Sequence, residues 1–109
     1  MDQDKRVGLN EAIFRQVNEQ IKSLDDELGS DDGEITVICE CGDAECTERI
    51  GLPLDMYERV RGDSLLYVIA PGHEFPEIES VVERSSGYEV VRKQAAEAVE
   101  VAEETDPRS

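Results

Sequence analysis

The stretch EITVICECGDAEC, residues 34–46, joins two patterns that together decide the fold. Its first part, residues 35–38, is β-branched throughout and is typical of a β-strand. Its second part places Cys39, Cys41 and Cys46 in a Cys-x-Cys-x4-Cys run. Because thiolates are favoured ligands of zinc, three thiols at the end of a strand predict a metal site on the loop that follows.

A closed tetrahedral zinc site needs a fourth ligand, and His73 is the single histidine of the chain. It follows the apolar run LLYVIA, residues 65–70, through the turn residues Pro71 and Gly72. If this run lies beside residues 34–39, the imidazole reaches the thiolates.

We therefore predict one Zn²⁺ ion held by Cys39, Cys41, Cys46 and His73. Three alternatives stay open for the fourth ligand, namely Asp43, Glu45 or a water molecule, and ligand type alone also fits iron. Gly42 is expected to let the loop fold back on itself. The side chain of Glu74 or the hydroxyl of Tyr67 is expected to orient the imidazole.

On the amino-terminal side of this stretch, the sequence predicts a long amphipathic helix. Asn10 is the expected N-cap, Gly29 the expected stop, and residues 1–8 are expected to be a flexible N-terminus. The apolar positions recur every three or four residues and are expected to face the core, with Phe14 widening the stripe: Leu9, Ile13, Val17, Ile21, Leu24 and Leu28.

On the carboxy-terminal side, shorter elements are expected. They are a return strand at 49–52, a helix from Leu54 that Gly62 ends, a central strand at 65–70, a helix starting near Pro76, a last strand at 88–93, and a helix-prone acidic tail at 94–109. A strand is the alternative for the segment after Pro76. The prediction is one α+β domain over residues 9–93, in which helices pack on a three- to five-stranded sheet.

The composition narrows the partners. Asp and Glu number 27 against 11 Lys and Arg, for a net charge of −16, and this field repels nucleic acid and anionic membranes. A protein with a basic surface is the expected partner. The chain shows no apolar run of the ~20 residues that span a bilayer, no secretory signal, and a cysteine pattern unlike a disulfide framework, so we expect a cytoplasmic protein.

Three functions are compatible with these features. The chain shows no Gly-rich phosphate loop and no Ser/His/Asp arrangement, so a zinc-stabilised interaction or regulatory module is expected rather than an enzyme. The first alternative is a thiol-based redox sensor. The second is a small metal-dependent hydrolase, which requires water at the fourth position of the metal.

Residues 39–46 resemble the cysteine segment of the post-SET region of lysine methyltransferases, which runs Cys-x-Cys-Gly-x3-Cys and binds zinc with a distant fourth ligand. The remaining motifs of a methyltransferase are not in the chain. The resemblance therefore implies a metal-binding geometry and no enzymatic activity.

Nearly the whole chain resembles a group of small, acidic bacterial proteins of unknown function. The resemblance rests on residues 14–21 (FRQVNEQI), 39–41 (CEC), 57–61 (YERVR), 70–74 (APGHE) and 102–108 (AEETDPR). It implies that the cysteine run and His73 belong to one unit.

Overall fold

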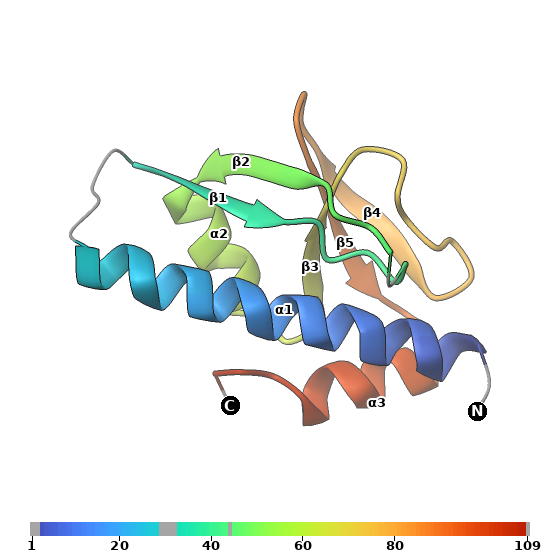
Figure 1. The fold of residues 1–109 in the computed structure, drawn as a ribbon. Coiled ribbons are helices and arrows are strands. Elements are labelled where there is room, and N and C mark those ends of the chain that lie inside the picture. The colour runs from blue at the N-terminus through green and yellow to red at the C-terminus, as the bar shows by residue number, and fades with distance from the viewer. Residues whose placement is uncertain (1–2, 29–32, 44, 109) are drawn as a thin grey trace.

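In the computed structural model, which describes residues 3–28, 33–43 and 45–108, the chain forms an α+β domain with two small antiparallel sheets (Figure 1). The elements in chain order are α1 (Gln3–Leu28), β1 (Glu34–Ile38), β2 (Arg49–Pro53), α2 (Leu54–Arg61), β3 (Leu66–Ile69), β4 (Glu79–Arg84), β5 (Glu89–Lys93) and α3 (Ala96–Glu104). The α+β prediction is confirmed, and the described strands number five.

The first sheet is the hairpin of β1 and β2, with Glu34 opposite Pro53 and Ile38 opposite Arg49. The second sheet has the order β3-β5-β4, so β5 is central. The expectation that residues 65–70 form the central strand is wrong, because the outer edge of β3 faces the cysteine loop instead of another strand. There the amide of Glu40 donates to the carbonyl of Val68 at 2.9 Å and joins the two sheets.

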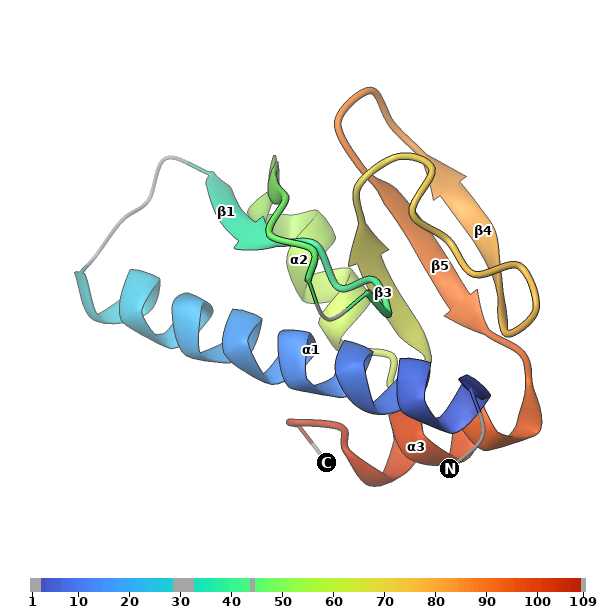
Figure 2. The ribbon, with the colours of Figure 1, turned by 45° about the vertical axis from the view of Figure 1, so that its right-hand side comes forward.

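Two expectations for the second half of the chain are corrected. The segment after Pro76 forms β4, the strand alternative, because it pairs with β5 through a bulge between Val81 and Glu83. Residues 94–109 were expected outside the domain, yet α3 buries Ala98, Val101 and Ala102. Figures 1 and 2 show α3 lying beside α1. The C-terminal helix therefore packs against the N-terminal helix.

The main core lies between the hairpin, α2 and β3, and its apolar side chains are almost completely buried. They include Val37, Ile50, Leu52, Tyr57, Val60, Val68, Ile69 and Val91. A smaller cluster of Val7, Ile78 and Ala98 joins the start of α1 to α3. Because Val7 is buried, α1 begins at Gln3 and not near Asn10, so the expected flexible N-terminus is helical from residue 3.

The expected inward face of α1 is wrong in part. Ile21 packs against the main core and Leu9 is half-buried, whereas the side chain of Leu28 and the expected stop at Gly29 lie outside the described residues. Ile13 is 60% exposed and Leu24 is 58% exposed, whereas Glu11, Arg15 and Asn18 are fully buried. The reason is that α1 covers backbone groups that need partners. Arg15 donates to the carbonyls of Ser64 and Ala102 at 2.6 and 2.8 Å, and Asn18 bonds the backbone of β1.

Among the described residues, no helix has the length and apolar character needed to cross a bilayer.

Candidate metal centre

The three cysteines lie on the loop that connects β1 to β2. Cys39 directly follows β1, as expected, and its amide donates to the carbonyl of Glu48 at 2.9 Å, which extends the hairpin by one step. The amide of Cys46 donates to the carbonyl of Asp43 at 3.0 Å and tightens the far end of the loop. The loop is therefore folded back so that all three thiols lie on one side of it.

His73 is brought to the thiols by a tight turn after β3. The amide of His73 donates to the carbonyl of Ala70 at 3.1 Å, and Gly72 has a φ of 84°. Proline in the second position and a positive φ in the third are typical of a type II turn, which favours glycine there. The Pro71-Gly72 pair therefore sets the position of the imidazole.

The ligand atoms of Cys39, Cys41, Cys46 and His73 all lie within 4.8 Å of one another. His73 Nδ1 is 3.6 Å from the sulfur of Cys39 and 3.6 Å from the sulfur of Cys46. In a tetrahedron with metal–sulfur distances of ~2.3 Å and a metal–nitrogen distance of ~2.0–2.1 Å, a sulfur and a nitrogen lie about 3.5–3.6 Å apart. The structure therefore places the four residues expected from sequence where one metal ion fits between them.

Each thiol also accepts a hydrogen bond from a backbone amide. The amide of Ala70 lies 3.1 Å from the sulfur of Cys39, and the amides of Asp43 and Glu48 bond Cys41 and Cys46. Such bonds favour the charged thiolate. These backbone amides thus offset part of the repulsion between three thiolates that lie close together.

The thiols share their protons unevenly. A hydrogen bond from Cys39 lowers the pKa of Cys41 to about 5, and the same bond raises the pKa of Cys39 well above its usual range. Burial raises the pKa of Cys46. Cys41 is thus the most acidic of the three thiols, and a divalent cation would favour deprotonation of all three.

Glu40, between two of the cysteines, is a supporting residue that the sequence reasoning missed. Its carboxylate is fully buried and accepts from Arg61 at 2.5 and 3.0 Å, from Asn18 at 2.7 Å and from the amide of Val68 at 3.0 Å. Burial lowers the pKa of Arg61, but the Glu40 carboxylate outweighs this and raises it above its usual range. A glutamate between two metal ligands was the only signal in the sequence.

Gly42 has a role different from the one expected. Its φ is not in the left-handed region, but a Cβ at this position would lie 2.1 Å from Cγ1 of Val7. Asn10, the expected N-cap, lies inside α1 and donates from Nδ2 to the carbonyl of Gly42 at 2.9 Å. Gly42 is therefore needed for the close approach of α1 to the cysteine loop.

The other expected participants do not join the cluster. The described residues offer no hydrogen bond from Glu74 or Tyr67 to the imidazole. Tyr67 lies under the cations of Arg15 and Lys93, each 4.6 Å from its ring centre. Asp43 accepts from the amide of Glu45, and neither acidic side chain is part of the four-residue group.

A hollow of about 290 Å³ lies beside the cluster and is lined by Cys41, Asp43, Gly72, His73, Glu74 and Phe75. Cys39 and Cys41 are buried, whereas Cys46 and His73 are partly buried.

Searches of family models, of curated proteins and of solved structures found no match for the chain. The interpretation of the site therefore rests on its geometry and donor set.

Proposed function

We propose that the chain is a zinc-stabilised interaction module whose metal is structural. The observation that carries this proposal is the buried group of three thiols and one imidazole within 4.8 Å of one another. Three sulfur ligands and one nitrogen ligand in a tetrahedral arrangement favour zinc, and four protein ligands leave no position for a catalytic water. This also argues against the hydrolase.

The ligands support a cross-linking role because they come from two parts of the fold. Three belong to the loop of the β1–β2 hairpin, and His73 belongs to the connection between β3 and β4. Among the described residues, the hydrogen bonds that join the two sheets here run from the amide of Glu40 to the carbonyl of Val68 and from the amides of Val68 and Ala70 to the side chains of Glu40 and Cys39. A metal ion at the centre would tie the two sheets together with bonds far stronger than these contacts.

Four exposed carboxylates lie close to the metal ligands along the chain. Asp43, Glu45 and Glu48 are exposed on the cysteine loop, and Glu77 is exposed after the His73 turn. These four residues are here called the acidic rim. We infer that the acidic rim meets a basic surface on a partner protein, which electrostatic complementarity would steer and orient.

The metal is tested on protein purified without added metal. We expect one zinc per chain by mass spectrometry of the metal content, and a strong loss of zinc in Cys41→Ser and His73→Ala. Asp43→Ala is the matched control, since this residue lies on the same loop outside the ligand group. Substitution by Co²⁺ should give the visible spectrum of a tetrahedral thiolate site. A chain without bound metal would refute the proposal, and bound iron would correct the identity of the metal.

The partner is tested by affinity capture from a lysate with the zinc-loaded chain. Asp43→Lys/Glu45→Lys reverses two charges of the acidic rim, and Glu103→Lys/Glu104→Lys reverses two exposed charges on α3 as the control. We expect the first variant alone to lose the captured protein, and capture to weaken as salt rises. Equal loss in both variants would show that only the net charge matters.

The redox sensor is retained as a second candidate because Cys46 is partly exposed and Cys41 lines the hollow. In that reaction, two thiols would give two protons and two electrons to hydrogen peroxide, yielding a disulfide and two waters, and the metal would leave. Zinc release by peroxide, reversed by dithiothreitol, would support this function. Zinc that stays bound throughout the treatment would exclude it.

A further inference from the structure

Helix α1 exposes three of its apolar residues, Ile13, Val17 and Leu24, to solvent. Between residues 7 and 24, every exposed side chain is uncharged, although the chain as a whole carries a net charge of −16. These six residues, here called the neutral stripe, are Ile13, Gln16, Val17, Gln20, Ser23 and Leu24. Absence of charge at the centre of a surface patch is the compositional signature of a protein–protein interface.

The charged residues of the same part of α1 are paired within the chain. Glu11 pairs with Lys93 in the interior, whereas Glu19 pairs with Arg108 and Lys22 with Asp26 at the surface. Arg15 is buried and donates to two backbone carbonyls. Helix α1 is therefore amphipathic in the reverse sense, and its own fold leaves the apolar side without a partner.

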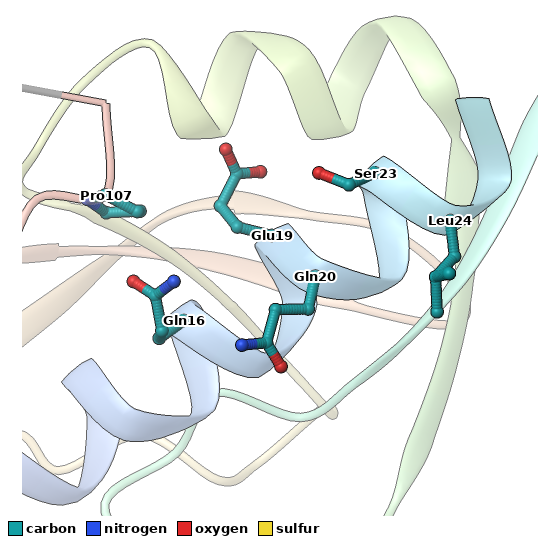
Figure 3. Close-up of a pocket in the computed structure, with 6 residues that line it drawn as sticks. All are labelled: Gln16, Glu19, Gln20, Ser23, Leu24 and Pro107. Carbon is teal, nitrogen blue, oxygen red and sulfur yellow. The ribbon is translucent and has the colours of Figure 1, made fainter. Parts of the chain in front are cut away.

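A groove runs along the neutral stripe. It measures about 540 Å³ and is lined by Gln16, Glu19, Gln20, Ser23, Leu24 and Pro107. Figure 3 shows that five of these side chains come from successive turns of α1 and that Pro107 closes one side from the C-terminal segment. The groove gives the neutral stripe a concave part beside the convex Ile13 and Val17.

We propose that the neutral stripe binds the neutral stripe of a second copy of this chain, with the two α1 helices antiparallel. Charge favours this occupant. The six residues offer no carboxylate to a basic partner, the Glu19 carboxylate in the groove is already paired with Arg108, and two copies repel one another least where their surfaces are uncharged. A two-fold axis is the usual symmetry of such a pair, and it lets one patch face itself.

The spacing of the stripe fixes the register. An axis between residues 18 and 19 sets Ile13 opposite Leu24 of the second copy and Val17 opposite Gln20 of the second copy. Each apolar end of the stripe then meets the other, over a length of about 16 Å at 1.5 Å per residue. Ile13 of the second copy enters the groove beside Leu24.

Association is tested with the zinc-loaded chain by sedimentation equilibrium over a wide concentration range. We expect a monomer–dimer equilibrium that Val17→Glu weakens at least about tenfold, because it buries an unpaired charge. Val82→Glu is the matched control, since Val82 is 53% exposed on β4, outside the stripe. Raised salt should strengthen the dimer by screening repulsion between the two acidic chains.

The register is tested with opposite charges. Ile13→Lys and Leu24→Glu should each weaken the dimer, and the double variant should restore it, because antiparallel pairing places each new cation opposite a new anion. A parallel pair would set like charges together and would not be restored. A chain that stays monomeric at every concentration, or a dimer that Val17→Glu and Val82→Glu affect equally, would overturn the proposal. Binding of a basic amphipathic peptide by a monomeric chain would do so too.

Discussion

Gly42 lies where α1 packs against the cysteine loop, and a substitution there tests this packing. A methyl group here would overlap Cγ1 of Val7, so we expect Gly42→Ala to lower the free energy of unfolding by about 1–3 kcal/mol and to weaken metal binding. Urea denaturation of the metal-loaded protein measures the first effect. Gly51→Ala is the control, because a Cβ there meets nothing within 4 Å.

A second substitution tests whether the contact between Val7 and position 42 causes this loss of stability. Val7→Ala removes Cγ1, so the double variant should recover part of the stability that Gly42→Ala loses. If the two losses simply add, the close contact between α1 and the loop is not the reason for glycine at position 42.

The buried ion pair of Glu40 and Arg61 gives a second prediction at the scale of residues. We expect Arg61→Ala to lower the free energy of unfolding by about 3–5 kcal/mol, because it leaves the Glu40 carboxylate buried without its cation. Arg59→Ala on the same helix should cost below about 1 kcal/mol, since Arg59 is 61% exposed in its pair with Glu83. Comparable losses in chemical denaturation would contradict this role of Glu40.

At the scale of elements, the sequence predicts which segments form helices and strands better than which side they bury. The metal ligands were predictable because three thiols and a single histidine leave few arrangements. The inward face of α1 was not, because apolar spacing assumes an apolar interior, whereas this interior contains carbonyls that Arg15 and Asn18 satisfy. The segment after Pro76 was ambiguous because its strand exists through pairing with β5, a non-local contact.

Glu11, Glu79 and Lys93 form a buried triad between α1 and the second sheet. This triad is expected to make the free energy of unfolding depend on pH. Burial raises the pKa of Glu11 well above its usual value, and Glu79 adds to this, although Lys93 opposes it. Folded protein then holds a proton that unfolded protein releases above roughly pH 4.5, so this residue costs stability as pH rises through that value until its folded pKa is passed.

Glu11→Gln should remove this cost. Relative to the wild type, the variant should gain free energy of unfolding between pH 4.5 and neutrality, and no gain is expected below that range, where the carboxyl is neutral in both states. Denaturant titrations at several pH values, with metal bound throughout, measure the difference. Glu100→Gln on the exposed side of α3 is the control, and a difference that does not change with pH would show that Glu11 is ionised in the fold.

At the scale of the whole molecule, a buried polar layer of Glu11, Arg15, Asn18, Glu40 and Arg61 lies beside the apolar interior. The identity of the partner could not be predicted, because the net charge of the chain indicates only that the partner's surface is basic. The neutral stripe on α1 emerges only from the structure, since the same residues in sequence predict a core.

Metal removal should show how far the fold depends on the centre. If zinc binds the folded chain and not the unfolded chain, each tenfold rise in free zinc above its dissociation constant should add about 1.4 kcal/mol to the free energy of unfolding. Chelation should therefore lower the melting temperature, and amide exchange should rise first in the cysteine loop and the His73 turn, because the metal joins these segments. The strands β4 and β5 should keep their protection longer, since their pairing does not involve the ligands. A melting temperature independent of zinc, with unchanged exchange in the cysteine loop, would mean that the two sheets hold together without the metal.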